Sequence, residues 1–340
     1  MSSLLDVKNL QVSFHTYAGE VQAVRDVSFS VEAGETLAVV GESGCGKSVM
    51  VKTLMGLIRK PGEIKSGSEI WVDGANILEY SRNDWRKYRG SICSIVFQDA
   101  MTALNPTLAV GKQIMENVLL HEKVSKREAW NQSVKMLELV GLPDPEQVMK
   151  RYAHELSGGQ RQRVMIAIAL VCHPKLLIAD EPTTALDVTI QAQIMKLIKS
   201  LQKQMGTSVI LITHDLGIVA DVAHRIVVMY GGRIVEKGSA RDIFYGSRHP
   251  YTWALLKAVP RLDRDGEKLF AIDGAPPSLI NPGRGCPFAD RCEFCMNICS
   301  AQEPPTYFFH DGHSAACWLH HPDAKIPNVP FEVGGAVEHE

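Results

Sequence analysis

The residues best suited to chemistry lie in a glycine-rich stretch, Gly41 to Ser48, directly after the apolar run Thr36 to Val40. The stretch fits the pattern GxxxxGK[ST], which is typical of a phosphate-binding loop between a strand and a helix. Glycines let consecutive backbone N–H groups turn inward around an anion, and the positive end of the following helix points to the same place. Lys47 can then reach the β- and γ-phosphates of a nucleotide, and the Ser48 hydroxyl can bind Mg²⁺.

Two carboxylates end a second apolar run. Leu176 to Ala179 is typical of a buried strand, and Asp180 and Glu181 follow it. Two acids at a buried strand end repel each other, so the pair needs a cation or a chemical role. We expect Asp180 to hold Mg²⁺, directly or through water, and Glu181 to orient and deprotonate the attacking water. The alternative is a solvated turn before Pro182.

Four further positions are open to two interpretations each. Gln98 follows an apolar strand and is either a solvated terminus or a group whose amide reaches Mg²⁺ or water. The serine and two glycines at 157–159 either cap a helix or form a second anion site from backbone N–H groups. His214 follows another strand and is either structural or able to reach a γ-phosphate. Phe14 is either a core residue or a platform for a nucleotide base.

Apolar periodicity predicts the elements that position these groups, and it predicts the α/β fold class. An antiparallel strand pair at the amino end comes first, and a helical insertion of about residues 101–172 interrupts an alternation of strands and helices. The expected strands are two within 4–31, then 68–74, 92–97, 176–181, 208–213 and a hairpin at 226–236, and the expected helices are 49–58, one that ends at Met205, and 241–259.

Length and net charge limit the classes of protein to which this chain can belong. The chain has 340 residues, which is comfortable for two domains, and its net charge is −2, which gives no general case for a nucleic-acid partner. No run approaches the roughly 18 apolar residues of a membrane-spanning helix, and Met1 to Leu10 lacks the pattern of a signal peptide. We therefore expect a cytosolic protein whose membrane role, if it has one, comes through partners.

Five of the eight cysteines fall in the last quarter of the chain. In a reducing cytosol such a cluster indicates a metal before disulfides. Four thiolates suit either a [4Fe–4S] cluster or structural zinc, and free or disulfide-bonded thiols are the third alternative. The five are Cys286, Cys292, Cys295, Cys299 and Cys317.

The order and spacing of these motifs resemble those of the ATP-binding-cassette (ABC) ATPases over roughly residues 4–240. The corresponding motifs are Walker A (Gly41 to Ser48), the Q-loop (Gln98), the signature motif (Leu156 to Gln160), Walker B with its glutamate (Leu176 to Glu181), the D-loop (Ala185 to Asp187), the switch histidine (His214) and the base-stacking aromatic (Phe14).

The resemblance implies an ATP site shared between two cassettes that pair head to tail, with an antiparallel β-subdomain and a helical subdomain beside the P-loop core. Catalysis is assigned to Glu181, His214 and Gln98, and Mg²⁺ to Ser48, Gln98 and Asp180. The implied nucleotide contacts are Phe14, Ser43, Gly44, Cys45, Gly46, Lys47, Ser48, Val49, Gln98 and Asp180, together with Ser157, Gly159, Gln160 and Asp187, of which Ser157 and Gly159 serve the partner's nucleotide.

A closer resemblance is to the peptide-importer subfamily, in particular the D-type ATPase subunits of oligopeptide permeases. It rests on residues 41–44, 97–106, 179–193 and 249–251 and on the cysteine-containing segment 285–292, with Ala100 and Cys45 as departures from the usual proline and serine. Importers of nickel or small glycosides from the same group are the nearest alternative.

This closer resemblance implies ATP-driven import of oligopeptides or dipeptides. The implied partners are a homologous ATPase subunit, two integral-membrane permease subunits and an extracytoplasmic peptide-binding protein, which places the chain at the cytoplasmic face of the membrane. Residues 1–240 would be the nucleotide-binding domain and 241–340 a small Cys/Pro-rich extension. Related subunits have cysteines that match Cys286, Cys292, Cys299 and Cys317, and Cys295 is extra.

Overall fold

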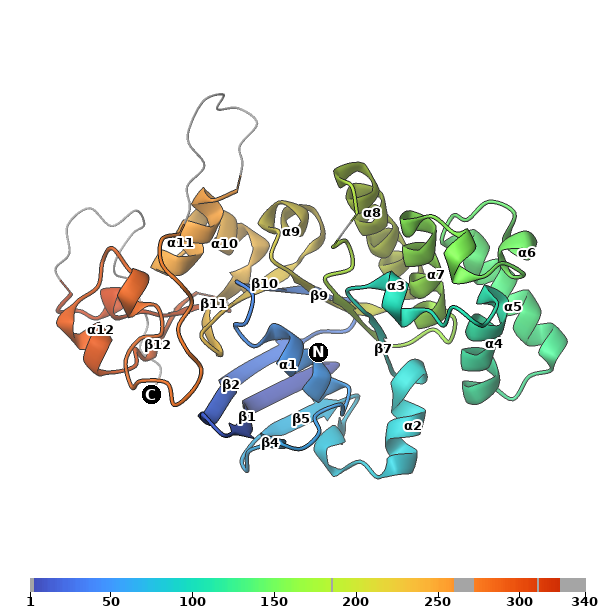
Figure 1. Ribbon diagram of the computed structural model, residues 1–340. Coiled ribbons are helices and arrows are strands. Elements are labelled where there is room, and N and C mark those ends of the chain that lie inside the picture. The colour runs from blue at the N-terminus through green and yellow to red at the C-terminus, as the bar shows by residue number, and fades with distance from the viewer. Residues whose placement is uncertain (1–2, 185, 260–271, 311, 325–340) are drawn as a thin grey trace. The chain divides into compact units, whose positions relative to one another are not determined.

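The computed structural model describes residues 3–184, 186–259, 272–310 and 312–324 (Figure 1). Contacts divide the chain into two compact units, each built from several segments. Unit 1 contains Met1–Leu5, Ser30–Thr36 and Trp71–Ile212, and unit 2 contains Asp6–Phe29, Leu37–Ile70 and Thr213–Glu340. The domain boundary expected near residue 240 stays a prediction.

Three parallel strands lie side by side in unit 1. Strand β8 (Leu176–Asp180) lies between β7 (Cys93–Val96) and β9 (Ser208–Thr213). Every residue of the three is buried except Ile95 and Asp180, which are half-buried. Such continuous apolar runs are typical of parallel strands that are covered on both faces. The three strands expected here from the sequence are confirmed.

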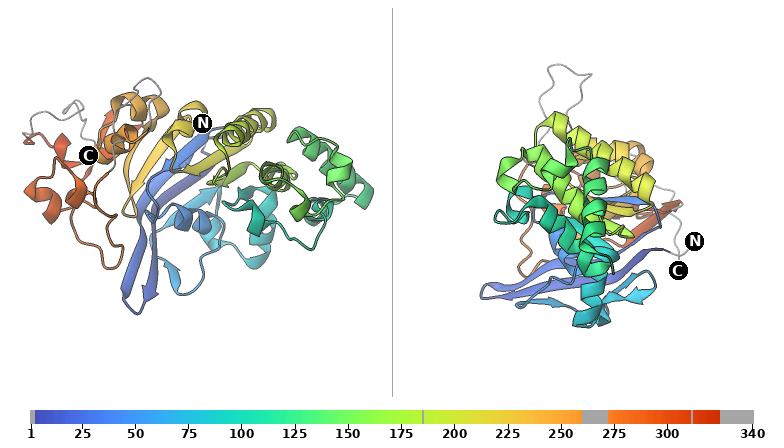
Figure 2. Two further views of the ribbon diagram at one scale, coloured as in Figure 1. Left: turned by 45° about the horizontal axis from the view of Figure 1, so that its top comes forward. Right: turned by 90° about the vertical axis from the view of Figure 1, so that its right-hand side faces the viewer.

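Helices make up most of the rest of unit 1, and the helical character expected for residues 101–172 is confirmed. Figures 1 and 2 show α4 to α7 gathered together, in green. The elements are β5 (Glu69–Val72, shared with unit 2), β6 (Ala75–Asn76), the 3-10 helices η1 (Ile77–Glu79) and η2 (Ala153–Glu155), and helices α2 (Arg82–Ser91), α3 (Ala100–Ala103), α4 (Val110–His121), α5 (Lys126–Leu139), α6 (Pro145–Val148), α7 (Gly158–Leu170) and α8 (Val188–Met205).

Local capping explains where the longer helices begin and end. The Asp187 side chain accepts the N–H of Ile190 at 2.9 Å and starts α8, and Gly206 at φ +67° ends it. The Ser125 hydroxyl accepts the N–H of Glu128 at 3.1 Å and starts α5. Both patterns are the usual start and stop signals of helices, and the helix end expected at Met205 is confirmed.

The first sheet of unit 2 contains two long strands. Strands β1 (Leu5–Thr16) and β2 (Gly19–Val31) are neighbours, and β4 (Gly62–Ile64) pairs antiparallel with β1. Figure 2 shows β1 and β2 side by side, in blue. Along β1, buried and exposed residues broadly alternate, as expected for a strand with one covered face. The two strands expected at the amino end are confirmed.

A second set of paired strands in unit 2 joins early and late segments of the chain. Strand β10 (Arg225–Tyr230) runs parallel to β3 (Thr36–Val40) and antiparallel to β11 (Arg233–Ser239). Strand β13 (His313–Ala316) continues the sheet from β11, and β12 (Thr306–His310) pairs with β13. The helices of unit 2 are α1 (Lys47–Leu54), α9 (Leu216–Val222), α10 (Ala240–Gly246), α11 (Pro250–Lys257) and α12 (Asn297–Ala301), with the 3-10 helices η3 (Ala289–Arg291) and η4 (Trp318–His320).

Helix α1 differs from the expected 49–58, because it begins at Lys47 and ends at Leu54. Gly56 has φ +61°, and the N–H of Leu57 donates to the carbonyl of Lys52 at 2.8 Å. A glycine in this left-handed conformation ends a helix by satisfying its last carbonyls. Gly56 is therefore the stop signal of α1.

Two expectations for the last hundred residues also change. The helix expected at 241–259 is two helices, α10 and α11, because Pro250 starts the second and disfavours helical geometry in the residue before it. The cysteine-rich tail contains the β12–β13 hairpin, which was not predicted. Tyr307 and Phe309 are buried on one face of β12, so an alternating pattern existed but covered only five residues.

No helix in the described segments is both long and apolar enough to cross a bilayer.

A buried carboxylate ties the late elements to β11. Glu236 is 1% exposed, and its carboxylate accepts the backbone N–H groups of Arg248 (2.6 Å) and His249 (3.1 Å) and the Nε2–H of His313 (2.9 Å). His249 in turn accepts the N–H of Tyr251 through Nδ1. Burial lowers the pKa of His249 to about 3, and burial lowers the pKa of His320 to about 4.

Acidification should destabilise the protein in a defined range. His249 and His320 are neutral when folded but accept protons near pH 6.5 when unfolded, so the stabilisation present above pH 6.5 is lost as the pH falls toward 4. At pH 5 each histidine should cost about 2 kcal/mol of unfolding free energy. Urea unfolding of His249→Asn, which keeps an N-cap acceptor, should show a shallower decline between pH 7 and 5. The exposed control His173→Asn should decline like wild type; an identical decline in all three would refute the assignment to His249.

Candidate functional site

The glycine-rich loop of unit 2 passes very close to two other backbone segments. A Cβ at Gly41 would lie 2.2 Å from the carbonyl oxygen of Met229 in β10, and a Cβ at Gly46 would lie 2.3 Å from that of Ala23 in β2. Neither distance leaves room for a side chain, so both positions require glycine. Strands β10 and β2 thereby hold the loop that the sequence predicts to bind phosphate.

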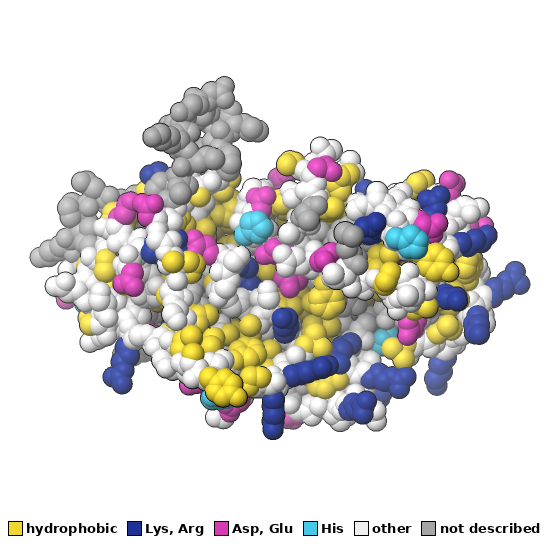
Figure 3. Space-filling model, viewed as in Figure 1, with side chains coloured by type: hydrophobic (Ala, Val, Ile, Leu, Met, Phe, Trp, Pro, Cys, Tyr) yellow, Lys and Arg dark blue, Asp and Glu magenta, His cyan; other side chains and the backbone are white. Residues whose placement is uncertain are grey.

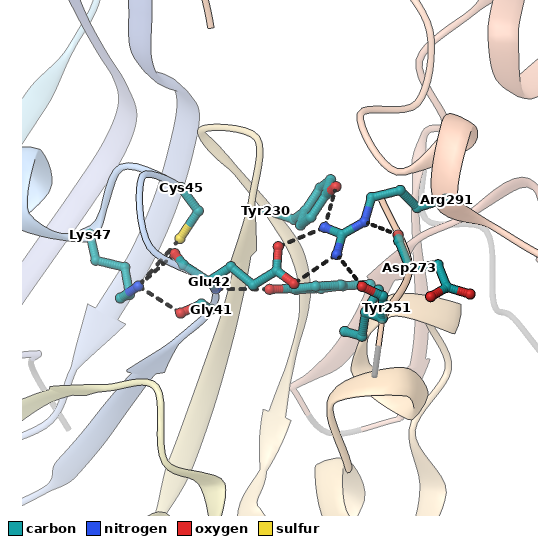
Figure 4. Close-up of polar contacts among 9 residues, drawn as sticks. Gly41, Glu42, Cys45, Lys47, Tyr230, Tyr251, Asp273 and Arg291 are labelled. Atoms are coloured by element: carbon teal, nitrogen blue, oxygen red, sulfur yellow. Dashed lines mark hydrogen bonds and ion pairs between the residues drawn. The ribbon is translucent and has the colours of Figure 1, made fainter. Parts of the chain in front are cut away.

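Lys47 is 5% exposed at the first residue of α1. Its Nζ donates to the carbonyl oxygens of Gly41 at 2.7 Å and Glu42 at 2.9 Å, and it lies 3.6 Å from Cys45 Sγ (Figure 4). Neutral carbonyls are weaker partners for an ammonium group than an anion is. A phosphate oxygen that reached Nζ would therefore be a favourable partner.

The other predicted residues of the loop differ in exposure. Ser43, Gly44 and Ser48 are exposed, and Val49 is half-buried. Cys45 is buried, and this burial raises the pKa of its thiol, so it stays protonated at neutral pH. The exposed side of the loop therefore carries the backbone and the hydroxyl that the sequence assigns to phosphate and Mg²⁺.

In unit 1 the ends of β7 and β8 bring two predicted catalytic residues together. Gln98 Nε2 donates to Glu181 Oε2 at 3.0 Å, and the Thr184 hydroxyl donates to the same oxygen at 2.9 Å. Glu181 has φ +46°, a conformation that non-glycine residues rarely adopt and that is frequent at functional sites. Asp180, just before it, is half-buried at the end of β8.

The sequence analysis did not identify Thr184 as a partner of Glu181. A hydroxyl three residues after the glutamate, in the turn that follows the strand, could have indicated this contact. The expected magnesium set of Ser48, Gln98 and Asp180 draws on both units and stays a prediction.

Ser157 is the N-cap of α7, which is one of the two interpretations of this serine. The Ser157 hydroxyl accepts the N–H of Gln160 at 3.3 Å, and Gln160 Oε1 accepts the N–H of Ser157 at 3.0 Å. A Cβ at Gly159 would lie 3.1 Å from Ile190, so a bare glycine lets α7 pack closely on the first turn of α8. The anion role of this helix start stays a prediction, as does that of Asp187, and Ala185 lies outside the described residues.

His214 and Phe14 lie in unit 2. His214 is exposed directly after β9, next to Asp215, which caps α9. Phe14 is half-buried, and a Cβ on its strand neighbour Gly62 would lie 2.7 Å from the ring, so the ring covers this glycine. Hydrophobic side chains gather over the ends of β1 and β2 in Figure 3. Both the core and the base-stacking interpretations of Phe14 stay open.

Four of the five clustered cysteines line one small cavity in unit 2. They are accompanied by apolar groups that include Phe288, Phe294 and Trp318. Cys295 is exposed and does not line it. The four cysteines are Cys286, Cys292, Cys299 and Cys317, the set that the resemblance indicates.

Burial raises the pKa of Cys286 to about 11 and of Cys292 to about 12, and burial also raises the pKa of Cys299 and Cys317. Thiols that are buried together resist deprotonation, because each thiolate would be desolvated and would repel the others. A bound cation removes both costs and deprotonates coordinating thiols. Four thiols around one cavity with an apolar shell therefore fit a metal centre.

The chain matches two family models. The model described as "ABC transporter" matches residues 24–184, and the model "Oligopeptide/dipeptide transporter, C-terminal region" matches residues 235–299. The oligopeptide transport ATP-binding protein OppD of Bacillus subtilis is 54% identical over 98% of this chain and 93% of its own length. The dipeptide transport ATP-binding protein DppD of the same organism is 52% identical over 94% of this chain and 95% of its own length.

Solved structures agree with this similarity. A dimeric post-hydrolysis structure of the ATP-binding cassette MJ0796, bound to ADP and Pi, superposes with a TM-score of 0.62 at 26% identity, covering 70% of this chain and 99% of its own. CbiO1 of Clostridium perfringens, part of an ABC transporter complex, has a TM-score of 0.61 at 30% identity, covering 72% of this chain and 91% of its own. The chain therefore belongs to the ABC transporter ATP-binding proteins of the oligopeptide/dipeptide transport family.

Proposed function

We propose that this chain is the ATP-hydrolysing subunit of an ABC importer for oligopeptides or dipeptides. The observation that carries the proposal is the extent of the similarity. The solved cassettes cover 70–72% of the chain, whereas the two Bacillus relatives cover 94–98% of it. Residues 235–299 also match the model described as "Oligopeptide/dipeptide transporter, C-terminal region".

The residues of the site suit hydrolysis of a nucleotide triphosphate. Lys47 would exchange its carbonyl partners for β- and γ-phosphate oxygens, with Ser48 and Asp180 on Mg²⁺, which would neutralise phosphate charge. Glu181 would orient the attacking water and accept its proton. Gln98 already bonds the Glu181 carboxylate, so it can position that group, and His214 would contact the γ-phosphate.

The proposed active assembly contains two ATPase subunits. Each ATP would lie between the loop of one subunit and the α7 start of the other, where Ser157, Gly159 and Gln160 would contact it and Asp187 would complete the interface. We infer that the second subunit is a homologous ATPase. A head-to-tail pair of this kind is consistent with the dimeric cassette structures to which the chain is similar.

The remaining proposed partners follow from the family. Two integral-membrane permease subunits would dock on the helical segment beside Gln98, and an extracytoplasmic binding protein would supply the peptide. The chain would then be peripheral, at the cytoplasmic face of the membrane.

Replacing the proposed catalytic carboxylate should separate binding from hydrolysis. Glu181→Gln keeps the size and one oxygen of the side chain but removes the base, so ATP hydrolysis should fall at least about a hundredfold while Mg·ATP affinity stays within about twofold. Peptide-stimulated ATPase activity of the assembled transporter and equilibrium ATP binding are the two measurements.

The matched control is Glu79→Gln, an exposed acid on η1 outside the helical segment, which should hydrolyse ATP like wild type. Wild-type turnover in Glu181→Gln would contradict the catalytic assignment. Stimulation by a nickel-loaded or glycoside-loaded binding protein, with none by peptide, would contradict the peptide assignment.

We further infer that the cysteine cavity holds a [4Fe–4S] cluster, with structural zinc as the alternative. Support comes from the four buried thiols, the apolar shell and the exclusion of Cys295. Bound metal would turn the loop-rich segment around residues 286–317 into a cross-linked unit, and the ATPase chemistry itself does not require it.

Anaerobic purification with metal and sulfide analysis tests the cofactor. We expect about four iron and four sulfide per chain, lost in Cys292→Ser and retained in the exposed control Cys295→Ser. One zinc per chain without sulfide would select the alternative. Retention of the metal in Cys292→Ser would overturn the ligand set, and absence of any metal would withdraw the cofactor while leaving the ATPase assignment intact.

A further inference from the structure

Arg291 makes an unusually complete set of contacts next to the phosphate-binding loop. Its Nη1 and Nη2 donate to the two carboxylate oxygens of Glu42 at 2.6 and 3.0 Å. Its other donors reach the Tyr230 hydroxyl (3.0 Å) and the carbonyls of Ile272 (3.1 Å) and Asp273 (2.8 Å) (Figure 4). These five bonds match the five N–H groups of a guanidinium, and the side chain is only 6% exposed.

Glu42 belongs to the loop that holds Lys47. Its carbonyl accepts from Lys47 Nζ at 2.9 Å, and its own N–H donates to the Tyr251 hydroxyl at 2.9 Å. The side chain is held by Arg291 and the backbone by Tyr251 and Lys47, as Figure 4 shows. Any movement of Glu42 therefore moves a carbonyl that binds the phosphate-contacting lysine.

The segment that carries Arg291 is bounded by cysteines of the cavity. Cys286 and Cys292 enclose it, with the N–H of Ala289 donating to the Cys286 carbonyl and the N–H of Cys292 donating to the Ala289 carbonyl. Phe288 in the same turn packs edge-on against Tyr230, with ring centroids 5.2 Å apart, and lies 5.3 Å from Tyr251. One short turn thus joins the cavity to the groups that hold Glu42.

We propose that Arg291 is a positioning residue for nucleotide binding, which holds Glu42 and the phosphate-binding loop in their binding geometry, and that the state of the cysteine cavity controls this hold. The first half stands on the contacts of Arg291 alone. The second half rests on the metal site proposed above, because a centre that cross-links Cys286 and Cys292 would fix the turn between them.

Charge and geometry both favour this role over simple surface pairing. A bidentate, largely buried arginine–carboxylate pair is directional, and removal of one partner leaves a poorly solvated charge. Lysine cannot replace the arginine, since a single ammonium group cannot bond both carboxylate oxygens and the two carbonyls at once. The hold on Glu42 consequently depends on the guanidinium itself.

A double-mutant cycle tests the hold on the loop. Binding of the non-hydrolysable analogue AMP-PNP with Mg²⁺ would be measured calorimetrically on the full chain for Arg291→Ala, Glu42→Ala and the double variant. We expect each single change to weaken binding about tenfold and the double change to weaken it no further, because the two residues act as one unit. The exposed Arg284→Ala in the same segment is the control and should bind like wild type.

Two outcomes would overturn the positioning role. Arg291→Ala could bind AMP-PNP within twofold of wild type, or the two single effects could multiply in the double variant. Should Arg291→Ala fail to fold, Arg291→Lys and Tyr251→Phe provide milder tests, since the latter removes only the hydroxyl that accepts the Glu42 N–H. We expect both to lose affinity while their unfolding temperatures stay near that of wild type; loss of stability with unchanged affinity would indicate a structural role only.

Metal loading tests the coupling separately. Metal-loaded wild type should bind AMP-PNP more tightly than chelator-treated wild type, and Arg291→Ala should show no such difference. Equal affinities of loaded and metal-free wild type would overturn the coupling. Failure to load any metal would overturn both the cysteine site and its coupling, and the Arg291–Glu42 cycle would still decide the positioning role.

Discussion

The buried ammonium group of Lys47 is the constraint on which the phosphate-binding loop depends. A buried cation needs oxygens around it, and the loop supplies the carbonyls of Gly41 and Glu42. The loop can follow this path because Gly41 and Gly46 have no side chain that would clash with the carbonyl oxygens of Met229 in β10 and Ala23 in β2. Strand β10 is in turn held between β3 and β11. The site is therefore a consequence of how the strands of unit 2 are paired.

Paired charges also attach the last third of the chain to its first. Glu303 bonds Arg25 and Arg233, each at 2.5 Å, and Arg291 bonds Glu42. Together with Glu236, which binds the start of α11 and β13, they make the cysteine-containing region part of the same compact unit as the loop. Removing Glu303 would leave Arg25 buried without this partner, and removing Glu42 would do the same to Arg291, so both carboxylates stabilise the attachment of the region.

The sheet edge in unit 1 that carries Gln98 and Glu181 is arranged by strand order. Parallel neighbours β7 and β8 end at the same edge of the sheet, so Gln98 and Glu181 meet although 83 residues separate them. The positive φ of Glu181 is a local strain that Gln98 and Thr184 help to hold. A strained backbone conformation is typical of residues whose side chain must be held in one orientation.

Local patterns in the sequence were sufficient for the motifs, the strands β1, β2, β7, β8 and β9, the end of α8 and the cysteine cluster, because each depends on neighbouring residues and on periodicity. They were not sufficient to predict the end of α1, the break before Pro250 or the β12–β13 hairpin, because at these places short sequence signals favour different structures. Only the tertiary structure could decide that Thr184 bonds Glu181, that the four cysteines line one cavity with an apolar shell, and that Arg291 bonds Glu42 across 249 residues of sequence. Such contacts arise from chain packing, which brings together residues whose spacing along the chain carries no period.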